Sequence, residues 1–87
     1  MKEYKIKKGF IVQKIGKKTV IFDGEQATLF TFNETASVIF KKIKLGWEVN
    51  QIIGFLIKKY KISEERAKKD VLELIADMKK KKIIEHN

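Results

Sequence analysis

A chain of 87 residues is long enough for one small domain, and the absence of cysteine excludes a disulfide framework and a thiolate metal site. Nineteen of its 20 cationic side chains are lysine, and the net charge of +9 favours acidic partners, although a solvated lysine surface explains the same charge. No apolar run approaches the roughly 20 residues of a membrane-spanning helix, and none near the start is long enough for a signal peptide, so we expect a cytoplasmic protein.

The first part of the chain predicts three β-strands. Residues 10–15 and 19–22 are short runs rich in β-branched and aromatic residues, separated by a turn at Gly16 and Lys17. Asp23-Gly24 is a strong hairpin signal, and residues 27–32 form a third run. Two successive hairpins predict a three-stranded antiparallel sheet with the third strand at an edge. We expect residues 1–8 to be flexible or loosely attached.

Three helices follow, each with apolar residues at helical spacing. Asn33 is a good N-cap for the first helix, which ends at Gly46, and the second helix covers about residues 48–60. Ser63 caps the third helix, which ends in the lysine run 79–82, and Ile83-Ile84 is expected to fold back as an apolar anchor. The order β-β-β-α-α-α predicts a single α+β domain over residues 1–87, of winged-helix-like type.

The predicted third strand lacks the features that usually protect an exposed sheet edge. It carries no charge, no lysine and no proline. Such an edge is either covered by the protein's own helices or left open for an extended peptide that adds a strand. The residues alone leave both alternatives open. The strand consists of Ala27, Thr28, Leu29, Phe30, Thr31 and Phe32.

A strip on the third helix is a second candidate binding surface. At 100° per residue, Lys68, Leu72, Ile75 and Lys79 fall beside the core stripe, to which Val71 belongs. We expect Leu72 to be partly exposed. An apolar pair between two lysines suits a peptide with hydrophobic anchors and acidic neighbours. The alternative is that Leu72 only widens the core contact.

Three segments of the chain carry a resemblance to a known family. They are Phe30 to Phe40, Gly46 to Tyr60, and Ala67 to Ile84. In order and spacing they resemble the PqqD family, named for pyrroloquinoline quinone biosynthesis protein D. The wider group is the RiPP recognition elements, which bind the leaders of ribosomally made precursor peptides. The resemblance covers about residues 9–85. Phe32 stands where the family usually has leucine, and Lys82 stands where glycine is common.

The resemblance implies a function without chemistry of its own. Such a domain binds the leader as an added strand on its third strand, beside the third helix, and presents it to a modifying enzyme, often a radical S-adenosylmethionine enzyme. We expect a monomer or weak homodimer without cofactor or metal. The implied peptide-binding residues are Ala27, Thr28, Leu29, Phe30, Thr31, Phe32, Lys68, Val71, Leu72, Ile75 and Lys79.

Two other classes of function fit the residues less well. A DNA-binding winged helix agrees with the charge and the helix order. However, Asp70, Glu73 and Asp77 on the third helix would repel phosphates, and Arg66 is the only arginine available to read guanine. An enzyme is disfavoured because no nucleophile–base pair, carboxylate pair or phosphate-binding glycine loop is recognisable. The sequence therefore predicts a peptide-binding protein, with DNA binding as the alternative.

Overall fold

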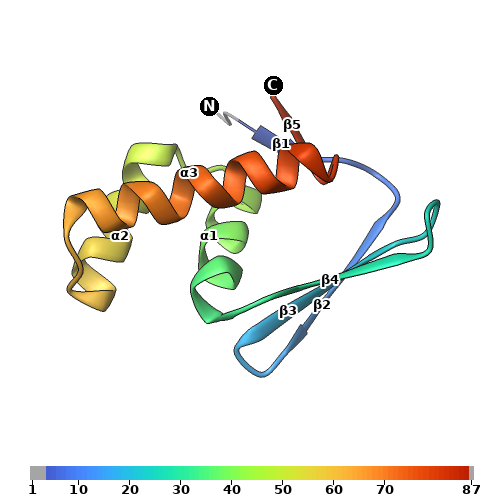
Figure 1. Cartoon of the computed structure of the whole chain (residues 1–87), viewed down its shortest axis with the longest axis horizontal. Helices are drawn as coiled ribbons and strands as arrows, with labels where there is room; N and C mark the ends of the chain where they lie inside the picture. Colours follow the sequence, from blue (N-terminus) through green and yellow to red (C-terminus); the bar gives the residue numbers. More distant parts are fainter. Residues whose placement is uncertain (1–3, 87) are drawn as a thin grey trace.

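The computed structural model describes residues 4–86, and its elements follow the predicted order with two short strands added (Figure 1). The main sheet and the helices occupy the middle of the chain. They are β2 (Phe10–Ile15), β3 (Lys18–Asp23), β4 (Thr28–Phe32), α1 (Glu34–Lys44), α2 (Val49–Tyr60) and α3 (Glu64–Lys80). At the two ends of the described chain lie β1 (Tyr4–Ile6) and β5 (Ile84–His86).

The three-stranded sheet is an antiparallel meander in the order β2-β3-β4, which places β2 and β4 at its edges. The sheet extends away from the three helices, and β4 leads directly into α1 (Figure 1). Residues paired across antiparallel strands share one face of a sheet. Val12, Ile21 and Phe30 form one such row, which packs against the core, and the neighbouring rows face away from the helices.

One apolar core joins the sheet to the helices. Phe32 at the end of β4 is 5% exposed, and its ring meets that of Phe40 in α1 edge to face, with centroids 5.7 Å apart. Burying an aliphatic or aromatic side chain contributes about 1.5–3 kcal/mol, so the core residues dominate the stability of this small domain. The core contains Ile21, Phe32, Ile39, Phe40, Ile43, Ile52, Ile53, Leu56, Ala67, Val71, Ile75, Met78, Ile83 and Ile84.

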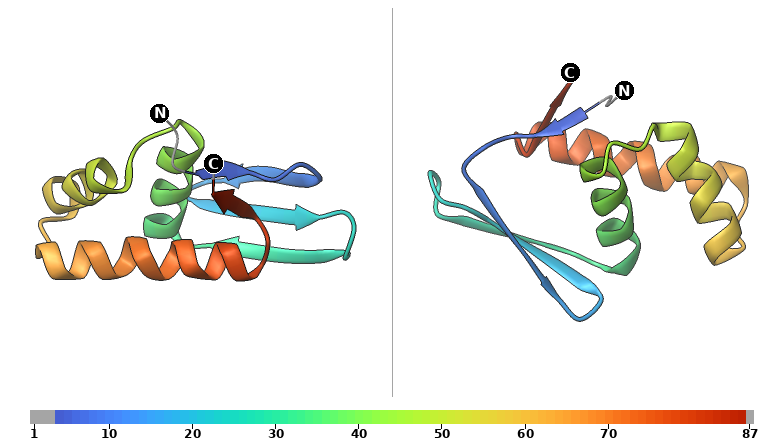
Figure 2. Two further views of the ribbon diagram at one scale, coloured as in Figure 1. Left: turned by 90° about the horizontal axis from the view of Figure 1, so that it is seen from above. Right: turned by 180° about the vertical axis from the view of Figure 1, so that it is seen from behind.

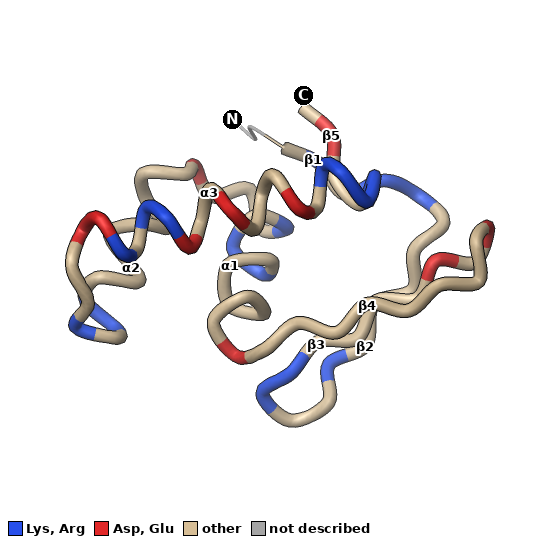
Figure 3. Tube along the Cα trace, viewed as in Figure 1, with Lys and Arg blue, Asp and Glu red and all other residues tan. Residues whose placement is uncertain are grey.

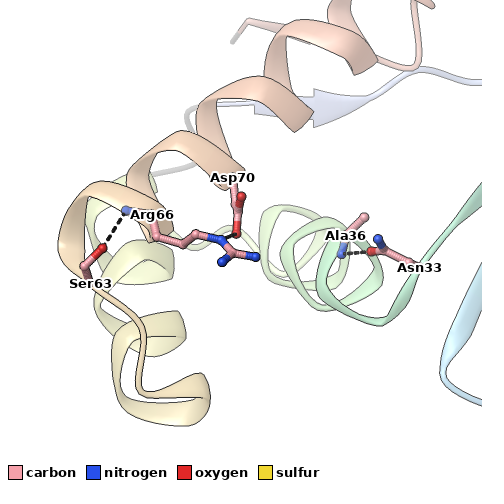
Figure 4. Close-up of polar contacts among 5 residues, drawn as sticks. All are labelled: Asn33, Ala36, Ser63, Arg66 and Asp70. Atoms are coloured by element: carbon pink, nitrogen blue, oxygen red, sulfur yellow. Dashed lines mark hydrogen bonds and ion pairs between the residues drawn. The ribbon is translucent and has the colours of Figure 1, made fainter.

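Side-chain caps fix where the first and third helices begin, as the sequence predicts. The Oδ1 atom of Asn33 accepts a hydrogen bond from the Ala36 N–H at 2.9 Å. The Oγ atom of Ser63 accepts one from the Arg66 N–H at 3.1 Å (Figure 4). Each such cap is worth about 1 kcal/mol. Because Asn33 directly follows β4, its cap also fixes the angle at which the strand enters α1.

The N-terminal strand corrects the expectation that residues 1–8 are loosely attached. Tyr4–Ile6 pairs antiparallel with Ile84–His86, with Ile6 opposite Ile84. The Tyr4 and His86 rings meet edge to face with centroids 4.7 Å apart. Strands of three residues are too short to show an alternating pattern, so the sequence gives no sign of them. For residues 1–3 the expectation lies outside the described residues.

The loop between β3 and β4 covers residues 24–27, one residue later along the chain than the strands predicted from sequence imply. Asp23 is buried, and its Oδ1 atom accepts hydrogen bonds from the N–H groups of Glu25 at 3.0 Å and Gln26 at 3.3 Å. Ala27 adopts a left-handed φ of 53° and lies in the loop, so β4 begins at Thr28. The assignment of Ala27 to the strand is therefore wrong, because the hydrogen bonds to Asp23 and the left-handed backbone of Ala27 keep this residue in the loop.

Replacing Lys82 with glycine will stabilise the domain. Lys82 follows α3 with a left-handed φ of 60°, which costs a non-glycine residue about 1 kcal/mol. We expect Lys82→Gly to raise the free energy of unfolding by about that amount, measured by urea denaturation. Lys69→Gly, in the interior of α3, is the control and should lower the free energy of unfolding by about 1 kcal/mol. A Lys82→Gly variant that is destabilised would contradict the argument.

Candidate functional site

The outer edge of β4 is open. Among residues 4–86, no strand pairs with the side of β4 that faces away from β3. Thr28, Leu29 and Thr31 are exposed and Phe30 is half-buried. The Leu29 residue is 62% exposed to solvent. Of the two alternatives that the sequence leaves, a covered edge and an open one, the described residues form the open one.

A hollow of about 350 Å³ lies next to the end of β4, between the start of α1 and the middle of α3. From α1 and the residue before it, Asn33, Ala36 and Ile39 line this hollow, and from α3 Asp70 and Leu74 line it. In Figure 4, the Arg66 and Asp70 side chains project from α3 toward the start of α1. Figure 2 shows α3 and β4 on the same side of the molecule, and the lining of the hollow begins at Asn33, the residue that follows β4.

Carboxylates dominate the flank of α3 on this surface. Arg66 Nε lies 3.7 Å from an oxygen of Asp70, and Lys81 Nζ lies 2.6 Å from an oxygen of Asp77. Glu73 also lines the hollow and forms no ion pair with any other residue in the range 4–86. Because Arg66 and Lys81 each pair with one of the other two carboxylates, the unpaired Glu73 gives the middle of the flank a net negative charge.

A cation links this flank of α3 to β4. The Nζ atom of Lys81, just beyond α3, lies 5.2 Å from the centroid of the Phe30 ring in β4. Phe30 belongs to the row that faces the core. The flank that carries Asp70, Leu74 and Asp77 therefore forms the wall opposite the open edge, and we call the space between them the β4–α3 groove.

The strip of α3 predicted from sequence lies on the other flank. Lys79 Nζ sits 5.0 Å from the centroid of the Tyr4 ring in β1, away from β4, and by helical spacing Lys68 and Leu72 share that flank. Leu72 is 46% exposed, as expected. The structure therefore does not bring Lys68, Leu72 and Lys79 to β4. The helical period places two equivalent flanks beside the core stripe, and only the topology decides which of them faces the strand.

Two further predicted residues, Val71 and Ile75, are core residues. Val71 is fully buried and Ile75 is 4% exposed, so both pack beneath the surface of α3. They can support the wall of the β4–α3 groove from inside the domain. The residues of this groove that the sequence does not predict as binding residues are Leu74, Asp70, Glu73 and Asp77.

The outer face of the sheet carries an exposed apolar row that crosses all three strands. Ile11 pairs with Phe22, and Phe22 pairs with Leu29. Their exposed fractions are 64%, 37% and 62%. Alternation along each strand predicts that these three residues share a face, but no sequence signal places that face in solvent. The row ends at the open edge of β4.

Other kinds of site find no support in the part of the chain that the structure describes. Between residues 4 and 86, no group of three or more His, Asp or Glu side chains could hold a metal ion. No helix in the same range is long and apolar enough to cross a membrane.

A family model described as coenzyme PQQ synthesis protein D matches residues 18–84, which include β3, β4 and all three helices. The chain belongs to the PqqD family. Membership confirms the resemblance read from the residues around Asn33 and in α2 and α3. The family match begins at β3, so it contains the open strand and the helix that forms the opposite wall of the groove.

Two solved structures share the fold of this PqqD-family chain. One is a lasso peptide synthetase B1 complexed with the leader peptide, with a TM-score of 0.89, 20% sequence identity, and coverage of 95% of this chain and 98% of that chain. The other is TbiB1 in complex with the TbiA(beta) leader peptide, with a TM-score of 0.86, 17% identity, and coverage of 93% and 94%. No curated protein matches the chain by sequence. These likenesses confirm the predicted α+β fold over nearly the whole chain.

Proposed function

We propose that this chain binds the leader segment of a ribosomally made precursor peptide as an added strand on β4 and presents it to a peptide-modifying enzyme. The observation that carries the proposal is the open, uncharged edge of Thr28–Phe32 beside the hollow next to α3. An extended peptide on such an edge gains main-chain hydrogen bonds, each worth about 0.5–1.5 kcal/mol net. Family membership and the leader-bound structural neighbours support the same function.

The peptide would lie in the β4–α3 groove. A strand added to a sheet lies about 4.8 Å from its neighbour, which puts the leader between β4 and the Asp70–Asp77 flank of α3. Its apolar side chains would contact Leu74 and Ile39 in the hollow. Because the wall carries carboxylates, neutral or basic leader residues fit this position better than the acidic ones expected from the lysines at 68 and 79.

In this proposal the chain is a binding partner and the catalysis belongs to the enzyme that receives the leader. A radical S-adenosylmethionine enzyme is one class that would fit. The chain itself needs no cofactor for strand addition, because backbone groups supply the affinity and side-chain contacts supply the selectivity. We place the protein in the cytoplasm, as a monomer or weak homodimer.

The direct test is a titration of the ¹⁵N-labelled chain with a synthetic leader peptide taken from a candidate precursor. We expect a dissociation constant in the micromolar range, equivalent to about −8 kcal/mol. Amide shift changes should concentrate at residues 28–32 and 70–77. A duplex DNA titration at the same salt concentration tests the alternative. Shift changes that avoid both segments, or tighter binding to DNA than to the leader, would reject the proposal.

Two leucines of α3 separate the β4–α3 groove from the opposite flank. Leu74 lines the hollow, whereas Leu72 lies on the flank away from β4. We expect Leu74→Ser to weaken leader binding at least tenfold, equivalent to about 1.4 kcal/mol, and Leu72→Ser to change it less than about twofold. Isothermal titration calorimetry, run well below the unfolding temperature of both variants, measures the difference. A larger loss in Leu72→Ser would return the site to the other flank.

A further inference from the structure

A second hollow, of about 420 Å³, lies between the inner face of β2 and α1. Val12 of β2 and Val38 of α1 supply its apolar lining. Lysines reach it from four different segments, namely β2, the turn after it, α1 and α2. They are Lys14, Lys17, Lys41, Lys44 and Lys59. Figure 3 shows cationic segments both at the turn between β2 and β3 and in the last turn of α1.

The positive charge around this hollow is largely unbalanced. Among the described residues that line it, Glu34 is the only carboxylate. Lys17 Nζ lies 3.9 Å from one oxygen of Glu34, and the Tyr60 hydroxyl donates a 3.3 Å hydrogen bond to the other. Burial and the Glu34 charge raise the pKa of Tyr60, so this donor keeps its proton near neutral pH.

Four of the five lysines have no acidic partner among the described residues. Lys14, Lys41, Lys44 and Lys59 form no ion pair with any residue between 4 and 86. Their aliphatic stems extend the apolar lining while the ammonium groups stay at the rim. An incoming carboxylate would therefore gain attraction here without displacing an ion pair that already exists.

The hollow also lies beside a free strand edge. β2 is the other edge of the sheet, and no strand among residues 4–86 pairs with its outer side. The domain thus has an open edge next to a hollow on each side, with a carboxylate-rich wall at β4 and a lysine-rich rim at β2. Because the strand β3 separates β2 from β4, a ligand at one edge leaves the other accessible.

We propose that the lysine-rimmed hollow beside β2 docks an extended, acidic and partly apolar segment of the modifying enzyme while the leader occupies β4. This inference rests on the proposed function. An aliphatic side chain of the segment would contact Val12 and Val38, and its carboxylates would meet Lys14, Lys41 and Lys44. Charge complementarity of this kind also accelerates encounter with the partner.

Other occupants fit the hollow less well than an acidic protein segment. Nucleic-acid sites favour arginine and exposed aromatic rings on which bases stack. The described residues that line this hollow include no arginine, and their single aromatic residue, Phe40, is only 2% exposed. A second copy of this chain would bring another net charge of +9 to a positively charged surface. The apolar lining and the lysine rim together favour a ligand that carries both apolar side chains and carboxylates.

The test uses a fluorescein-labelled eight-residue peptide in which Glu alternates with Val. A peptide in which Lys alternates with Val and a 12-nucleotide single strand of thymidines are the comparison probes. By fluorescence anisotropy at about 0.15 M salt, we expect the acidic peptide to bind at least tenfold more tightly than either comparison probe. In NMR titrations it should shift the amides of Val12, Lys41 and Lys44, also when the leader is already bound. Tighter binding of the oligonucleotide, or shifts at β4 instead, would overturn the proposal.

Two double variants with the same change in net charge separate a local site from general attraction. The double variant Lys41→Glu/Lys44→Glu should lower the affinity for the acidic peptide at least tenfold. The double variant Lys69→Glu/Lys80→Glu on α3 should change this affinity less than about twofold. Equal losses in both variants would overturn the proposal. Leader titrations of the same proteins run in parallel. Intact leader binding without binding of the acidic peptide rejects this inference alone, and the reverse result rejects the proposed function alone.

Discussion

Replacing Thr31 with proline will weaken leader binding at least tenfold, equivalent to about 1.4 kcal/mol, while the domain stays folded. Thr31 lies in the open edge strand, and its side chain is exposed on the outer face of the sheet. Proline lacks the backbone N–H, and its ring disturbs the regular strand conformation that an added strand needs. Because the core contacts of β4 come from Phe30 and Phe32, the ring at position 31 does not displace a buried side chain.

The matched control for this variant lies on the opposite edge. Ile15 and Lys18 flank a two-residue turn, so they and the pair Gln13–Val20 are hydrogen-bonded, and the N–H of Lys14 points outward from β2 as that of Thr31 does from β4. Calorimetric titration should show a normal leader affinity for Lys14→Pro, and circular dichroism should show that both variants are folded. Equal losses of affinity would mean that proline acts through general weakening of the sheet and that β4 is not the binding edge.

Truncating Phe32 to alanine will have the largest effect on stability among single changes in β4. We expect the free energy of unfolding to fall by about 3–5 kcal/mol, measured by urea denaturation. The ring is almost fully buried and packs against Phe40, so its removal leaves a cavity where β4 joins α1. Small domains have only about 5–15 kcal/mol in total, so this single change removes a large share of the stability.

Leu29→Ala is the control for the Phe32 variant. Both residues lie in β4, but Leu29 is on the outer face and mostly exposed. Its truncation should change the free energy of unfolding by no more than about 0.5 kcal/mol. A similar loss in both variants, or a loss below about 1 kcal/mol for Phe32→Ala, would show that the junction between β4 and α1 does not anchor the strand as described.

Most of the fold could be predicted because it follows from local patterns. The caps at Asn33 and Ser63 indicate where α1 and α3 begin. The spacing of the apolar residues predicts which face of each helix is buried. The pairing of β1 with β5 could not be predicted, because its strands are three residues long and lie at opposite ends of the chain. The loop at Ala27 was also missed, since its shape depends on two hydrogen bonds to the buried Asp23 carboxylate.

The candidate site could be predicted only in part. The composition of residues 28–32 indicates an unprotected edge, and the structure has that edge open. Which flank of α3 faces β4 could not be predicted, because helical spacing defines both flanks equally well and the contact between Lys81 and Phe30 is long-range. A signal was present in the sequence. Asp70, Glu73 and Asp77 recur at helical spacing, so the sequence alone indicates that one flank of α3 is acidic.

The apolar row formed by Ile11, Phe22 and Leu29 also shapes how the protein behaves at high concentration. These three exposed side chains form an apolar patch that favours association between molecules. Electrostatic repulsion between copies that each carry a net charge of +9 opposes this association. Concentrated salt shortens the range of this repulsion to about 3 Å at 1 M and leaves the apolar patch unchanged. We therefore expect self-association of the protein to increase with ionic strength and to be weakest in buffers of low salt concentration.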